Sequence, residues 1–172
     1  MTPINPDTRH YEVMRRTMCN LQFVRKHAAE GGPFEVVQLL NSFTGAMVHP
    51  WEAINSSDPL HLKKLSLEEA RRRDWPVLEI EISGQDTEPA CYWQMLHWTR
   101  HAIAHGNVSF LDDDNEISHI KLWNMRGSKR NWGTVLTMEL MEDFLWFFYD
   151  LTLNELPKPR SLHPRIFAHA AD

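Results

Sequence analysis

Apolar side chains recur every three to four residues in four long segments of this chain. Such spacing places them on one face of a helix, which then packs against a core. The four segments are residues 10–29, 33–48, 89–105 and 137–156. A shorter helix is expected over residues 66–75, because Ser66 and Glu69 stand at capping-box spacing. These patterns predict a mainly helical, all-α fold.

Helix-ending residues separate the segments. Gly31 and Gly32 end the first helix and Pro33 starts the second, whereas Gly106 provides a left-handed stop after the third. Residues 108–111 and 117–123 alternate around an acidic turn, which predicts a small β-hairpin inserted beside the end of the third helix. Helices joined by short links then predict an up-and-down bundle of four to five helices.

Length and composition indicate one globular domain. A chain of 172 residues with 42% hydrophobic and 24% charged residues is expected to bury a sizeable core as a single domain, 1–172. Its core is expected over residues 10–156, and residues 157–172 read as a C-terminal tail. No signal peptide or membrane segment is expected, and Cys19 and Cys91 are interpreted as reduced thiols. The predicted location is cytoplasmic.

The net charge is acidic. A formal charge of −5 argues against avid, nonspecific binding of nucleic acid, so any contact with RNA is expected to be local. Basic residues gather in three places, and each group fits either a local RNA contact or, more simply, a solvated charged face. They lie within residues 63–73, 126–130 and 158–165.

The third helix ends in Arg-His-Ala-Ile-Ala-His, residues 100–105, followed by Gly106 and Asn107. An Arg guanidinium is always charged and binds phosphate oxygens through two parallel hydrogen bonds, and His exchanges protons near neutral pH. His101 and His105 are four residues apart and share a helix face. The motif therefore indicates phosphodiester chemistry, with capping of the helix end or a His-His metal site as alternatives.

The surroundings of the motif resemble those of the HEPN superfamily, whose compact helical domains often act as ribonucleases. A tryptophan-rich helix precedes the motif at residues 92–99, small residues lie within it, and a Gly-Asn stop follows. Further likeness to a plasmid-associated branch of that superfamily is found in residues 23–27, 31–35, 39–42, 117–120 and 123–124. The resemblance spans roughly residues 10 to 153.

The resemblance implies an endoribonuclease whose site is completed across a homodimer. RNA supplies its own nucleophile, the 2′-hydroxyl, so cleavage needs a base, an acid and a cation but no metal or other cofactor. Arg100 is expected to hold the phosphate, His105 to act as the acid or base, and His101 to orient or hydrogen-bond. Asn107 is expected to position the ribose or the loop. The implied setting is stress, toxin or phage defence, and an antitoxin or regulatory protein is a further candidate partner.

Other residues are weaker candidates for substrate binding. They are His119 in the expected hairpin, and Asn41 and Glu35 on the second helix, where helix-packing hydrogen bonds explain them equally well. A second function also fits the sequence: a catalytically inactive HEPN-like dimer that binds a nucleotide or a protein partner. The acidic net charge favours this alternative, whereas the Arg100 and His105 pair favours an enzyme.

Overall fold

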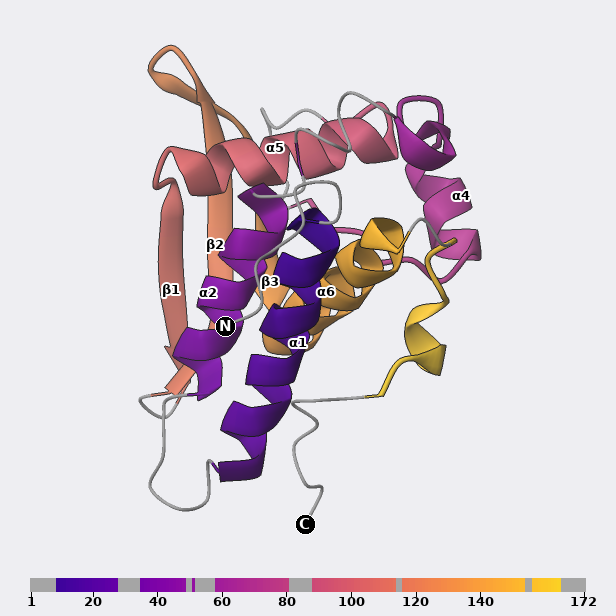
Figure 1. Ribbon diagram of the computed structural model, residues 1–172. Helices are drawn as coiled ribbons and strands as arrows, with labels where there is room; N and C mark the ends of the chain where they lie inside the picture. The colour runs from indigo at the N-terminus through magenta and orange to yellow at the C-terminus, as the bar shows by residue number, and fades with distance from the viewer. Residues whose placement is uncertain are drawn as a thin grey trace.

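The computed structural model describes residues 9–27, 35–48, 51, 58–80, 88–113, 116–153 and 156–164. These residues form mainly helices, as predicted, together with a three-stranded sheet that the prediction of an all-α class did not include (Figure 1). The α-helices are α1 (Arg9–His27), α2 (Glu35–Val48), α4 (Leu67–Arg72), α5 (Tyr92–Ala104) and α6 (Met138–Thr152). The strands are β1 (Val108–Asp113), β2 (Glu116–Arg126) and β3 (Lys129–Thr137), and two short 3-10 helices are η3 (Pro59–His61) and η4 (Arg160–Leu162).

The β-structure is larger than the hairpin expected from the sequence. The three strands form an antiparallel sheet in the order β1-β2-β3. The strand β3 was not predicted, because Gly133 at its centre and an irregularity at Asn131 hide the alternation of its side chains. Residues 126–130, one of the three basic groups, form the ends of β2 and β3 around a tight turn at Gly127 and Ser128.

The helices pack in two directions. α1, α2 and α6 contact one another, whereas α5 lies across them and contacts α2 and β2 (Figure 1). The expected up-and-down bundle is therefore not shown directly. Because α5 contacts β2, the motif at its C-terminal end lies beside the sheet.

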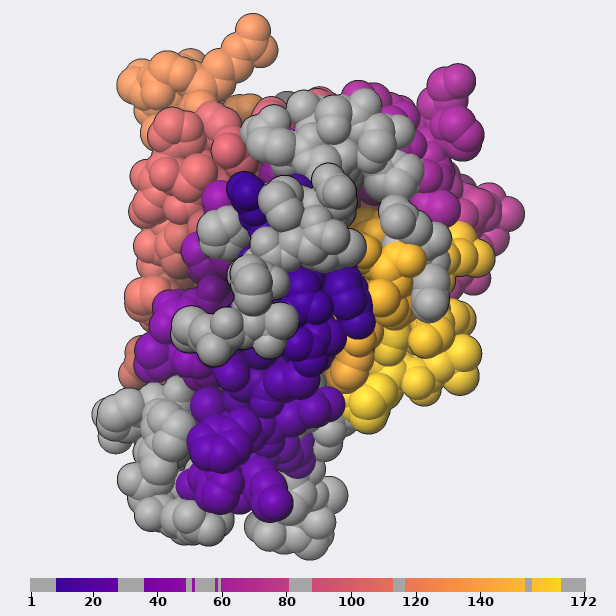
Figure 2. Space-filling view, in the orientation of Figure 1, coloured from indigo at the N-terminus to yellow at the C-terminus, as the bar shows by residue number. Residues whose placement is uncertain are grey.

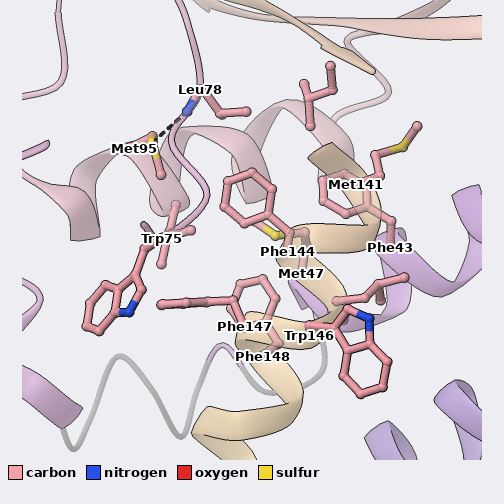
Figure 3. Packing of buried hydrophobic residues seen from close by; sticks show 14 of the residues in the cluster. Phe43, Met47, Trp75, Leu78, Met95, Met141, Phe144, Trp146, Phe147 and Phe148 are labelled. Carbon is pink, nitrogen blue, oxygen red and sulfur yellow. Dashed lines mark hydrogen bonds between the residues drawn. The ribbon is translucent and has the colours of Figure 1, made fainter. Parts of the chain in front are cut away.

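The core is strongly aromatic and centres on α6. Phe147 makes edge-on contacts with Trp75 and Tyr92, each at 5.3 Å between ring centroids, and Phe144 contacts Phe43 of α2 at 6.1 Å (Figure 3). All five rings are 2% exposed or less. Burying a side chain of this size contributes about 1.5–3 kcal/mol, so these contacts hold α2, α5 and α6 together.

Part of the segment interpreted as a C-terminal tail packs against the body. The Trp75 Nε1–H donates to the Pro157 carbonyl (2.9 Å), and Arg160 bonds Asp74 through its Nε (3.0 Å). The pKa of Asp74 is lowered, chiefly by the backbone N–H of Ser161 and also by Arg160. Residues 156–164 therefore have defined contacts, and residues 165–172 lie outside the described residues.

The described part of the chain holds no helix that combines the length and apolar character needed to cross a membrane. The two cysteines are not joined: Cys19 is exposed on α1, and Cys91 precedes α5. The Ser66 hydroxyl accepts a hydrogen bond from the Glu69 N–H, so Ser66 caps the helix as predicted. The Glu69 carboxylate pairs with Arg72 and Arg73 instead of completing the capping box.

The end of α5 is fixed by backbone hydrogen bonds of the Schellman type. The Gly106 N–H donates to the Ile103 carbonyl (3.1 Å) and the Asn107 N–H to the Ala102 carbonyl (2.9 Å). Gly106 has the left-handed φ of 67° that this motif requires. The Asn107 carbonyl then accepts from the Trp123 N–H (3.2 Å), which ties the end of the helix to β2.

Replacing Gly106 tests this ending. Nothing lies within 4 Å of a Cβ added at Gly106, so Gly106→Ala introduces backbone strain alone and is expected to destabilise the fold by about 1 kcal/mol. Gly106→Asn is the matched control, since Asn tolerates a left-handed φ, and it should cost less. Urea unfolding measures both. An alanine variant as stable as the parent would contradict this description of the helix end.

Candidate functional site

Three histidines form a row along α5. His97, His101 and His105 follow one another at four-residue spacing, with ring centroids 6.3 Å and 4.2 Å apart. Arg100 is half-buried beside them, and its Nε atom is buried without a hydrogen-bond partner. Within the described residues Arg100 forms no ion pair with an acid. Its charge is thus not neutralised by a neighbouring carboxylate there.

A buried asparagine joins this row to the sheet. Asn124 of β2 is 5% exposed, and its amide lies between two groups of α5. The Asn124 Nδ2–H donates to the Trp98 carbonyl at 2.9 Å, and the Asn124 Oδ1 lies 2.9 Å from His101 Nδ1. Both halves of the amide are therefore satisfied, as a buried polar group requires.

This arrangement determines which nitrogen of His101 carries the hydrogen. A carbonyl oxygen only accepts, so the Nδ2 end of Asn124 must face Trp98 and the Oδ1 end must face His101. Because Oδ1 also only accepts, His101 must donate through Nδ1–H. In the neutral imidazole the other nitrogen, Nε2, then has its lone pair available to accept a proton.

His97 lies among aromatic rings. It stacks on Trp93 at 5.0 Å with an interplanar angle of 6°, and on Trp51 at 5.5 Å. Burial lowers the pKa of His97 below its usual value of 6.5, and the charges of His101 and Arg100 lower it further. His97 is therefore neutral at neutral pH.

His105 differs from the other two histidines in its exposure. It is the C-cap residue of α5, and its backbone N–H donates to the His101 carbonyl at 3.1 Å. The residue is exposed to solvent, while its ring remains 4.2 Å from that of His101. One imidazole of the pair is thus oriented by the protein and the other is accessible from outside.

An open cleft lies next to His101. It has a volume of about 190 Å³ and is lined by His97, Trp98, His101, Asn124, Met125, Arg126 and Asn131. Asn124 pairs with Trp132 and Met125 pairs with Arg130, so Asn131 is an extra residue on β3, a β-bulge. A bulge interrupts side-chain alternation and redirects a side chain, which explains how Asn131 reaches the same cleft as Asn124.

The sequence pattern of the HEPN pEK499 p136 family matches residues 2–158, which is most of the chain. The chain belongs to this HEPN family. The resemblance inferred from residues 100–107 and their surroundings is thereby confirmed. A search of the curated proteins found no match to this HEPN chain, and a search of the solved structures found none either.

The structure brings some of the predicted site residues of the HEPN chain together and not others. Arg100, His101 and His105 share the end of α5, where the backbone of Asn107 links that end to β2. His119 bonds Ser118 (2.9 Å) and pairs with Leu111 and Thr137, on the sheet face opposite Asn124.

Two further candidates lie on α2. Asn41 is exposed and does not line the cleft, whereas Glu35 begins α2 and its side chain lies outside the described part of the chain.

Of the residues that line the cleft in this HEPN chain, His101 was predicted as a site residue and Arg126 was noted only as part of a basic group. The others were not predicted to form a site: His97, Trp98, Asn124, Met125 and Asn131. Asn124 carried a usable signal, because it continues the inward-facing series of Ile120 and Leu122 on β2. A polar residue at a buried strand position needs a specific partner. Asn131 gave no such signal, since its position depends on a bulge.

Metal ligation was an alternative for His101 and His105. Among the described residues of the HEPN chain, no group of three or more His, Cys, Asp or Glu side chains is placed to hold a metal ion.

The low pKa of His97 is measurable. An NMR titration of the parent should give a His97 pKa below 6.5, and Arg100→Gln should raise it only partway, because burial is the larger cause. Because the pKa of His97 is lower in the folded state than in the unfolded state, protonation of His97 favours unfolding. The stability that neutral His97 provides is therefore fully present above pH 6.5 and is lost as the pH falls through the folded-state pKa. Arg9→Gln, an exposed change on α1, is the control. A His97 pKa at or above 6.5 in the parent would contradict the burial argument.

Proposed function

We propose that this HEPN protein is a metal-independent endoribonuclease that cleaves RNA by attack of the 2′-hydroxyl on the neighbouring phosphate. HEPN family membership supports a ribonuclease, and Arg100 with the His101 and His105 pair supplies the groups that such a reaction needs. The observation that carries the proposal is the hydrogen bond from His101 to Asn124. It occupies Nδ1 of His101 and leaves Nε2 of the same neutral ring to accept a proton.

The proposed roles follow from position. His101 accepts the proton of the 2′-hydroxyl through Nε2 while the 2′-oxygen bonds to phosphorus. His105 gives a proton to the departing 5′-oxygen as the bond from phosphorus to that oxygen breaks. Arg100 stabilises the negative charge on the phosphate oxygens during this exchange. The products are a 2′,3′-cyclic phosphate and a 5′-hydroxyl, so His101 ends protonated, His105 ends neutral, and no net proton is consumed.

The acid and base are proposed to act across a homodimer, as the family resemblance implies. A twofold axis beside α5 would place His105 of one copy opposite the same residue of the second copy. The accessible position of His105 supports this arrangement. Phe110 supports it further, because it follows the motif on the edge strand β1 and is 51% exposed, which leaves a large apolar side chain available to a second copy.

Cleavage of a fluorescent single-stranded RNA in EDTA tests the proposal. Arg100→Ala, His101→Ala and His105→Ala should each lower the rate about 100-fold or more, since each removes a proton-transferring or charge-stabilising group. Arg100→Lys should also be slow, because an ammonium group lacks the planar fork of Arg. Arg9→Ala is the control and should cleave like the parent. Circular dichroism confirms that each variant is folded.

A chimeric DNA strand with a single ribonucleotide sharpens the assay. Cleavage should occur only on the 3′ side of that ribonucleotide and leave a cyclic phosphate. Mixed Arg100→Ala and His105→Ala chains should regain part of the parent activity if the two copies share a site. Folded variants that cleave as fast as the parent would refute these roles. RNA binding without cleavage at any pH would instead identify an inactive nucleotide-binding module.

A further inference from the structure

The turn between β2 and β3 projects from the body of the molecule. Figure 1 shows it extending beyond α5, and the space-filling view in Figure 2 shows its light-orange tip standing clear of the surrounding surface. Two cations, Arg126 and Lys129, are exposed at this tip, and neither is paired with an acid among the described residues. We call residues 125–130 the basic arm.

The two cations of the basic arm lie directly opposite each other. Arg126 and Lys129 are cross-strand partners on either side of the two-residue turn. Like charges in this position repel and destabilise a hairpin. An anion bound between them would remove that repulsion.

The third cation of the basic arm points elsewhere. The Arg130 guanidinium lies where a side chain on Gly133 would otherwise be, so it is folded back along β3. Only Arg126 and Lys129 are thus presented at the tip. Arg126 is also part of the lining of the cleft beside His101, so the basic arm and the cleft form one continuous surface.

The cleft has the chemistry of a nucleobase site. Trp98, Met125 and the ring of His97 give it apolar and aromatic walls. The Asn131 amide supplies the hydrogen-bonding group, since its Oδ1 is buried without a hydrogen-bond partner. Single-stranded RNA presents unstacked bases that bind against such walls and along their polar edges, whereas bases within an A-form duplex are not accessible in this way.

We propose that the cleft binds the base of the nucleotide adjoining the scissile bond, and that Arg126 and Lys129 bind its flanking phosphates. The inference rests on the proposed ribonuclease function and specifies its substrate as single-stranded RNA. It also accounts for RNA binding by an acidic protein, because the contact is confined to the arm and the cleft.

The phosphate contacts are tested by salt dependence. Fluorescence anisotropy measures the binding of a mixed-sequence single-stranded RNA to His105→Ala protein in EDTA, where cleavage is suppressed. Each phosphate contact contributes about 0.7 to the slope of log K against log salt for single strands. Adding Arg126→Gln and Lys129→Gln removes two such contacts and should therefore make the negative slope less steep by about 1.4. Arg9→Gln with Lys26→Gln makes the same change of charge on exposed residues of α1 and should leave the slope unaltered.

The base contacts are tested by specificity. Asn131→Ala should change the relative affinities for four homopolymeric RNA oligonucleotides while leaving the salt slope as it was. A general loss of structure would lower all four affinities together. A duplex of the same sequence should bind more weakly than the single strand.

The outcomes separate this inference from the proposed function. If the parent cleaves RNA but the arm variant keeps the full salt slope, or Asn131→Ala leaves the four relative affinities unchanged, the assigned contacts are wrong and the ribonuclease function remains. If the parent neither binds nor cleaves RNA, both fail. A reduced slope with changed specificity, each confined to its own variant, supports the inference.

Discussion

The buried amide of Asn124 is the interaction on which the candidate site depends. It bonds the Trp98 carbonyl and the His101 ring at the same time, and so joins the helix that carries the motif to the central strand of the sheet. Without it, the imidazole of His101 would be free to rotate and to exchange its tautomer. The Schellman ending at Gly106 fixes the end of α5, and the hydrogen bond from the Trp123 N–H to the Asn107 carbonyl attaches that end to β2.

Much of the helical framework was predictable from the sequence, because its signals are local. The spacing of Phe144, Phe147 and Phe148 gives the buried face of α6, and Gly106 marks the end of α5 by its conformational freedom. The motif at residues 100–105 was equally visible, since one helical turn brings its imidazoles together. What these residues do in catalysis remains a proposal.

The rest depended on contacts between distant segments. β3 escaped prediction because its pairing with β2 outweighs the weak strand pattern around Gly133. Asn124 and Asn131 acquire their positions from strand register and from a bulge, neither of which a single sequence reveals. The cleft is therefore visible only in the tertiary structure. The basic residues 126–130 were visible in the sequence, but their position beside the cleft was not. They give a protein with a net charge of −5 a local basic surface.

The protonation of the His101 ring tests the central claim most directly. Nitrogen-15 NMR of the side chain, above the pH at which the ring becomes neutral, distinguishes the nitrogen that carries hydrogen from the one that does not. If Asn124 orients the ring, the parent should show a protonated Nδ1 and an unprotonated Nε2, and Asn124→Ala should show a mixture of tautomers. A parent ring protonated at Nε2, or one unaffected by the loss of Asn124, would contradict this role of Asn124.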